Sequence, residues 1–337
     1  MRMLPAMRPL VRVAAAVPLL LVLLACADEG GVGGGAGADT STSPSGSATL
    51  YTCVSDTTIQ PLIAQFEKQN PGSTIDLFRA PTGELNARIA ADVRSGGFTA
   101  DALWACDPLT MQGYVDQDVV GGWIPQGADD IPPEYRTDDY VGVAVLYMVA
   151  IHHQDSPAPT SWADLADSEG VAVPDPSVAA SALGALGYLA QSSDYGLGFY
   201  QDLKDNGAVQ LSTPDEVTTG VAQGIYKSGM TIANSAYAAE EAGSPVGVVW
   251  PEPGAIAVYG PIAVAKDSDS QVAKAFMTYV LSEPGQQLLA ESGSYPTRPG
   301  IDGPTVPDGA PVVFPDWADV GKDKDGLLGG YTSIFGG

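Results

Sequence analysis

The chain has 337 residues, a formal net charge of −25 and a hydrophobic content of 45%. This length suits one large domain or two ordinary ones, and the apolar fraction is sufficient for a packed core. A chain this acidic is repelled by nucleic acids and by anionic lipids, so general electrostatic binding to either is excluded as its function.

The N-terminus has the pattern of a secretion signal. Arg2, Arg8 and Arg12 precede the apolar run 13–27, which small residues close. The run is shorter than the ~20 residues that a membrane-spanning helix needs, so a permanent transmembrane helix is the weaker interpretation. Removing residues 1–25 would take away three arginines and no acidic residue, which leaves a still more acidic chain.

The end of this run resembles the lipobox of bacterial lipoproteins in the sequence Leu-Leu-Ala-Cys at residues 23–26. The resemblance implies a signal peptide over 1–25, cleavage before Cys26 and a diacylglycerol on its thiol. We therefore expect an extracytoplasmic protein that is anchored by lipid to the cell membrane. A cleaved signal with Cys26 unmodified is the alternative. Glycine, serine and threonine dominate the following segment, and they predict a flexible linker over 26–47.

Strands and helices alternate from residue 48 onward. Apolar runs predict strands at 50–52, 74–78 and 102–104, and helical spacing predicts helices at 59–69 and 82–94. This order predicts a parallel sheet with right-handed crossovers. The segment 141–151 reads as one or two buried strands, and the rhythm then restarts. The later expected strands are 171–173, 231–233, 246–250, 255–259 and 261–265, and the later helices are 179–191, 199–206, 214–228, 272–282 and 285–292.

Two cysteines remain once Cys26 is assigned to lipid. Cys53 and Cys106 each follow a short apolar stretch, 48–52 and 100–105. If these stretches are neighbouring parallel strands, both thiols lie at the same edge of the sheet, where a disulfide can form. An even pair in an extracytoplasmic protein favours that disulfide over two buried free thiols.

Several sequence blocks, taken in order, resemble an extracellular solute-binding protein of an ABC importer, in the ferric-iron, thiamine and phosphonate-type branch. The blocks are residues 61–67, 82–85, 159–165, 171–177, 249–254, 273–276, 284–288 and 295–299. The resemblance covers about 48–301. It implies a two-lobe α/β fold of the periplasmic-binding-protein type II, each lobe a mostly parallel sheet flanked by helices, with the ligand cleft between the lobes.

The same resemblance implies how the chain is divided and what it does. Lobe 1 is expected over 48–148 plus 262–337 and lobe 2 over 149–261, with the chain crossing between lobes near 143–150 and 260–265. The protein would capture a small polar solute and deliver it to a membrane permease. We expect a monomer with no catalytic residues, no cofactor and no nucleic-acid partner.

Polar residues at the expected carboxyl ends of strands are the candidate ligand contacts, because open parallel sheets bind ligands there. They are Ser55, Asp56, Arg79, Thr82, Gly83, Glu84, Asp107, Ser177, Ser235, Tyr237 and Tyr259. Helix starts near 82 and 177 favour an anion, and Arg79 could add a fork for a phosphonate or carboxylate. The acidic residues could hold an ammonium group, so a zwitterion also fits. Thr82 and Ser177 could instead be simple helix caps.

Two other functions stay open. Iron-binding members of the branch hold ferric ion through clustered tyrosines, often an adjacent pair, but Tyr237 has no tyrosine neighbour. Tyr237, Tyr259, Asp56, Glu84 and Asp107 could still supply oxygen ligands, so a ferric-binding protein is the main alternative. A tethered carboxylate-dependent hydrolase is a distant one, because no Gly-x-Ser-x-Gly, His-Glu-x-x-His or phosphate-loop motif is present.

Overall fold

The computed structural model describes residues 43–304 and 306–336. The expected signal peptide, Cys26 and most of the expected linker lie outside the described residues. Within the part that the structure describes, no helix is both long enough and apolar enough to cross a membrane.

The first half of the chain forms the expected alternation. Its elements are β1 (Gly46–Thr52), α1 (Asp56–Gln69), β2 (Ser73–Arg79), α2 (Thr82–Ser95), β3 (Ala102–Trp104) and α3 (Pro108–Val115), followed by short 3₁₀ helices at Ala128–Asp130 and Pro133–Tyr135. Strand β1 pairs in parallel with both β2 and β3. The parallel sheet predicted from the periodicity is therefore confirmed, and the residues after β1, β2 and β3 share one edge.

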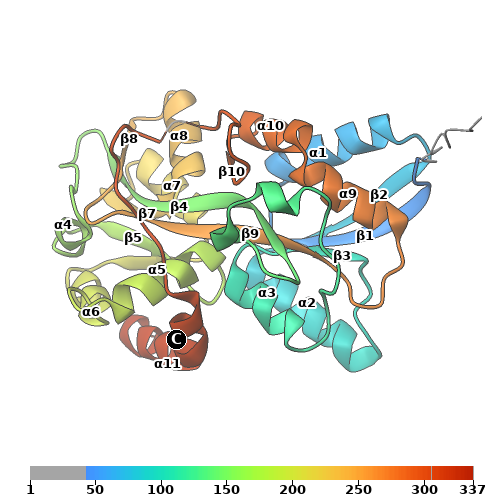
Figure 1. The fold of residues 1–337 in the computed structure, drawn as a ribbon. Coiled ribbons are helices and arrows are strands. Elements are labelled where there is room, and N and C mark those ends of the chain that lie inside the picture. Colours follow the sequence, from blue (N-terminus) through green and yellow to red (C-terminus); the bar gives the residue numbers. More distant parts are fainter. Residues whose placement is uncertain (1–42, 305, 337) are drawn as a thin grey trace, which may run out of the picture. The chain divides into compact units, whose positions relative to one another are not determined.

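Two long strands cross the middle of the sheet, whose order is β2-β1-β3-β9-β4-β7-β5-β6 (Figure 1). They are β4 (Val141–His153) and β9 (Ala255–Val264), which pair with each other antiparallel. The two strands expected at 255–259 and 261–265 are a single strand, and all ten residues of β9 are buried. The strand accommodates Pro261, which has no N–H to donate, where the pairing with β4 shifts register between Gly142 and Ala144.

The second half of the sheet lies on the other side of the crossing strands. Its elements are α4 (Trp162–Ala166), β5 (Val171–Pro174), α5 (Ala180–Gln191), α6 (Gly198–Asp205), β6 (Val209–Leu211), α7 (Pro214–Ala222), β7 (Ser228–Ile232), α8 (Ala233–Glu241) and β8 (Val246–Val249). Strand β5 pairs in parallel with β6 and β7, whereas β7 and β8 pair antiparallel with β4. The helix expected at 214–228 ends at Ala222, and residues 234–237, which follow the strand expected at 231–233, belong to α8.

The last elements return to both halves. They are α9 (Gln271–Leu281), α10 (Glu283–Glu291), β10 (Tyr295–Pro296), β11 (Val312–Val313) and α11 (Trp317–Phe335). Helix α9 packs on α1, with the rings of Phe66 and Phe276 5.2 Å apart. Helix α11 lies instead against α5 and α6, and its Leu327 and Tyr331 are buried in a cluster with Leu186 and Phe199 (Figure 1).

Two of the core clusters are built from different helices, α1, α9 and α10 in one and α4, α5, α6 and α11 in the other, whereas a further cluster joins α2 and α3 to the start of α8. We call the part built on β1–β3, α1–α3, α9 and α10 the first lobe, and the part built on β5–β7, α4–α8 and α11 the second lobe. The expected division into lobes, which assigned residues 262–337 to the first lobe, stays a prediction. Within that range, α11 packs against α5 and α6 and also contacts α3.

Candidate functional site

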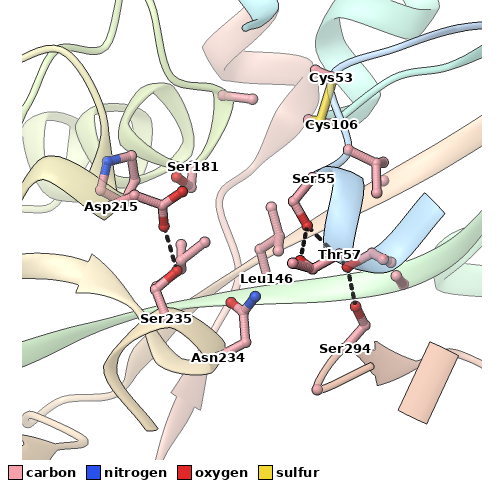
Figure 2. A pocket seen from close by; sticks show the side chains of 18 of the residues that line it. Cys53, Ser55, Thr57, Cys106, Leu146, Ser181, Asp215, Asn234, Ser235 and Ser294 are labelled. Carbon is pink, nitrogen blue, oxygen red and sulfur yellow. Dashed lines mark hydrogen bonds between the residues drawn. A yellow bond between two sulfur atoms is a disulfide. The ribbon is translucent and has the colours of Figure 1, made fainter. Parts of the chain in front are cut away.

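A cavity of about 480 Å³ opens where strand ends of the first lobe face helix starts of the second. Figure 2 shows these two walls, with Leu146 of β4 between them. The side chains labelled on the first-lobe wall are Cys53, Ser55, Thr57, Cys106 and Ser294, and those on the second-lobe wall are Ser181, Asp215, Asn234 and Ser235. Crossing strand β9 contributes Gly260. The cavity thus lies at the carboxyl ends of the parallel strands, where ligands of open α/β sheets bind.

Five of the expected ligand contacts line this cavity, and a disulfide joins its two cysteines. The five are Ser55, Arg79, Thr82, Ser235 and Tyr237. Cys53 and Cys106 also line it and form the expected disulfide, with their Cα atoms 6.0 Å apart. The disulfide ties the residue after β1 to the second residue after β3, and so holds together two segments of the first-lobe wall.

Four other candidates lie at the rim or outside the lining. Asp56 and Glu84 are exposed in the first turns of α1 and α2. Ser177 is exposed, and its N–H and hydroxyl both donate to Asp175. The Gly83 N–H donates to the carbonyl of Val178 at 3.4 Å, which joins the start of α2 to the second lobe. A Cβ at position 83 would lie 3.0 Å from the Ser177 carbonyl oxygen, so glycine permits this close approach.

The last two candidates, Asp107 and Tyr259, are buried outside the lining. Asp107 caps α3, where its Oδ1 accepts from the Thr110 N–H at 2.6 Å. The Tyr259 ring packs edge-on against Tyr135, with ring centres 5.4 Å apart. Both side chains were expected at the cleft because polar residues often follow strands there, but the structure uses them in the protein interior.

The buried carboxylate of Asp107 gives a stability prediction. Burial raises the pKa of Asp107 above its ordinary value of 3.8, outweighing its hydrogen bonds to Thr110. The charged form is therefore disfavoured in the folded state, and this cost is present at neutral pH and vanishes as pH falls toward the ordinary pKa. Asp107→Asn, which keeps the cap acceptor, should raise the melting temperature at pH 7, with a smaller gain at pH 4.5. A melting temperature that is lower than wild type at both pH values would contradict this.

Several helices begin at the cavity without a side-chain cap. Helices α1, α2, α5 and α8 all lack a capping hydrogen bond from their N-cap side chain. Neither Thr82 nor Ser177 acts as an N-cap, because those positions are held by Pro81 and Ala179. The free N–H groups of a helix start carry partial positive charge and bind anions.

Charged side chains are distributed unevenly over the two walls. Arg79 of the first lobe is the single cation in the described lining, and its Nε donates to the Val54 carbonyl at 3.2 Å. It makes no ion pair with any residue that the structure describes. Asp215 and Glu241 belong to the second-lobe wall, and Glu291 lies at the end of α10. The Ser235 hydroxyl donates to Asp215 at 2.5 Å. The anion-binding character is therefore concentrated in the first lobe.

Tyr237 is the one tyrosine among the described lining residues. Its hydroxyl accepts from the Trp250 Nε1 at 2.9 Å. Burial raises the pKa of Tyr237, so the phenol is neutral at physiological pH and retains a proton to donate. Within residues 43–304 and 306–336, no three His, Cys, Asp or Glu side chains are grouped so that they could hold a metal ion.

Sequence reasoning missed part of the lining. Thr57, Thr58, Ser181 and Ser294 contribute hydroxyl groups, and Trp104 and Asn234 contribute polar atoms. Asn234 adjoins the candidate Ser235, so the polar sequence at these two positions could have indicated Asn234 as a lining residue. Trp104 reads only as an apolar residue of a buried strand, and nothing in the sequence marks its indole nitrogen.

Comparison with known proteins gives the class of this two-lobe α/β chain. The model of a family described as bacterial extracellular solute-binding protein matches residues 49–294. The chain belongs to this family, the class that the sequence blocks indicated, and it has the mixed α/β two-lobe periplasmic-binding-protein fold of type II.

Solved structures with the same fold have distant sequences. The periplasmic binding protein AfuA from Actinobacillus pleuropneumoniae, solved with fructose-6-phosphate bound, is 16% identical with a TM-score of 0.77, over 86% of this chain and 98% of that one. The apo ferric ion-binding protein A of Pasteurella haemolytica is 18% identical with a TM-score of 0.73, over 86% of this chain and 97% of that one. Iron-bound HitA from Pseudomonas aeruginosa is 18% identical with a TM-score of 0.72, over 86% of this chain and 99% of that one. No match is found among curated protein sequences.

Proposed function

We propose that this protein is the substrate-binding component of an ABC importer and that its solute is a small oxyanion, such as a phosphonate, including zwitterionic ones. The observation that carries the proposal is the first-lobe wall of the cavity, where Arg79 and the uncapped starts of α1 and α2 meet. The proposed contacts are Ser55, Arg79 and Thr82 of this wall, with Ser235 and Tyr237 opposite.

The chemistry of this wall suits an anion. An uncapped helix start offers backbone N–H groups at its positive end, although in α2 the Gly83 N–H already donates to Val178, and Ser55 and Thr82 add hydroxyl donors beside it. A guanidinium without an ion-pair partner can donate two parallel hydrogen bonds to a phosphonate or carboxylate. Closure of the lobes would surround the bound solute, and contacts such as that of Gly83 with Val178 would favour the closed state.

The ferric alternative has less support from this cavity. Ferric ion is a hard cation and prefers anionic oxygen ligands. A tyrosine can serve as such a ligand only as a phenolate, so its phenol must lose its proton readily. Tyr237 is the lone tyrosine in the described lining, and burial raises its pKa, which opposes phenolate formation. AfuA, which was solved with a phosphate ester bound, has the same fold as the ferric-binding structures, so the fold itself accepts either kind of ligand.

Replacing Arg79 tests the proposal. Because a charge-assisted hydrogen bond is worth about 1.5–3 kcal/mol, Arg79→Ala should weaken phosphonate binding roughly 10- to 100-fold in isothermal titration calorimetry. Arg94→Ala is the matched control, since Arg94 is an exposed arginine in the last turn of α2, the helix that follows Arg79 in the chain, and does not line the cavity. Equal losses in both variants, or tight ferric citrate binding without binding of any oxyanion, would refute the proposal.

We also propose that the lipid anchor at Cys26 holds the protein at the outer face of the membrane beside its permease. The family supports an extracytoplasmic location. A Cys26→Ser variant that stayed in the membrane fraction to the same extent as wild type would refute the anchor.

A further inference from the structure

Trp104 carries a buried hydrogen-bond donor that the protein leaves unused. It is the last residue of β3, is only 1% exposed and lines the cavity. Its indole Nε1 has no hydrogen-bond partner in the described structure. An indole N–H can only donate, and a buried N–H without an acceptor is unfavourable, so an acceptor atom at this point gains affinity.

The crossing strand β9 keeps space free beside this nitrogen. Gly260 faces the end of β3, and a Cβ on it would lie 3.2 Å from the Trp104 Nε1 and 3.0 Å from the Ala105 carbonyl oxygen. Any other residue at position 260 would therefore crowd the donor. Gly260 also lines the cavity, so the space beside the indole N–H belongs to the solute site.

Asn234 presents the opposite kind of group from the second lobe. It is the second residue of α8, and its Oδ1 is buried with no hydrogen-bond partner among the described residues. A side-chain amide oxygen can only accept, so it calls for a donor. Its neighbour Ser235 donates to Asp215, which places a carboxylate on the same wall (Figure 2).

We propose that Trp104 and Asn234 bind the two ends of the solute. The Trp104 N–H donates a hydrogen bond to its oxyanion, and the Asn234 Oδ1 accepts one from an ammonium or hydroxyl group at its other end. This inference rests on the proposed function, because the oxyanion is placed in the first lobe by Arg79. The second-lobe wall, with Asn234 beside Asp215, then selects against oxyanions that end in a methyl group. Trp104 and Asn234 thus determine specificity within the oxyanion class.

A series of three phosphonates of equal length tests the donor end on the unmodified protein. They are n-propylphosphonate, 2-hydroxyethylphosphonate and 2-aminoethylphosphonate, which end in a methyl, a hydroxyl and an ammonium group. Because an unpaired buried acceptor costs about 1–3 kcal/mol, calorimetry should show the hydroxyl and ammonium compounds binding roughly tenfold or more tightly than the propyl compound. The difference in affinity between 2-hydroxyethylphosphonate and 2-aminoethylphosphonate distinguishes a hydroxylated solute from an amino one. Equal affinities for all three compounds would overturn the inference.

Variants assign the two ends to their residues. Asn234→Leu, of similar size, should abolish the preference between the three compounds while binding of n-propylphosphonate persists. Trp104→Phe should weaken all three by a similar factor, with the melting temperature recorded to confirm a folded protein. An intact preference in Asn234→Leu, or unchanged affinities in folded Trp104→Phe, would overturn the corresponding assignment. Failure of all phosphonates to bind wild type refutes the proposed function itself, whereas Arg79-dependent binding without preference refutes only this inference.

Discussion

Replacing Gln286 by methionine should lower the free energy of unfolding by about 3 kcal/mol or more, because it leaves several buried backbone groups without a hydrogen-bond partner at once. Gln286 is fully buried in α10. Its Nε2 donates to the carbonyls of Val143 and Val280, both at 3.0 Å. Its Oε1 accepts from the N–H groups of Thr297 and Arg298, at 3.1 and 3.2 Å. Methionine fills a similar volume but makes none of these bonds.

The neighbouring residue supplies the control for this experiment. Gln287 is exposed on the same helix and makes no side-chain hydrogen bond within the described structure. Gln287→Met should therefore change stability by less than about 0.5 kcal/mol in urea denaturation, as surface substitutions usually do. Similar losses in the two variants would show that the buried network does not hold α10 to crossing strand β4 as we describe.

Replacing Cys53 and Cys106 together by serine should weaken both the fold and the solute site. The disulfide closes a loop across a sequence separation of 53, and loss of such a bridge typically costs about 2–4 kcal/mol. Both cysteines also line the cavity, so release of the ends of β1 and β3 should loosen the wall that holds Ser55 and should lower phosphonate affinity. Urea denaturation and calorimetry measure the two effects separately.

Reduction supplies the matched comparison for the cysteine variant. Treatment of wild type with a phosphine reductant should reproduce the losses, and the same treatment should leave the double serine variant unchanged. Unaltered stability and affinity in the double variant would contradict the role that we assign to the disulfide.

Much of the fold could be predicted because distant sequence blocks pack against each other. Gln286 and Thr297 lie in two of the blocks on which the family resemblance rests, and the structure joins them by a hydrogen bond. Trp162 and Gly254 lie in two others, and the Trp162 Nε1 donates to the Gly254 carbonyl at 2.9 Å. Blocks that are recognisable in the sequence are thus in contact in the structure. The disulfide was predictable from the parallel pairing of β1 and β3.

Other elements escaped prediction because tertiary contacts decide them. Glycines and charged residues obscure helix α11 in the sequence, although Leu327, Tyr331 and Phe335 recur every four residues, and their burial against the second lobe stabilises the helix. The start of α8 reads as a polar loop, since Asn234 and Ser235 are poor helix formers, yet both lie in the helix and line the cavity. Asp107 follows a strand as a ligand contact would, but its carboxylate turns inward to cap α3.

Native mass spectrometry of the protein purified without denaturation tests the central claim most directly. If the cavity captures a small oxyanion, the folded protein should carry a mass adduct of a small organic acid, and unfolding should release it. Phosphonates with a terminal ammonium or hydroxyl group should restore the adduct after dialysis, and Arg79→Ala should reduce its occupancy. An adduct with the mass of iron, or a protein that stays at its bare mass with every oxyanion offered, would contradict the account.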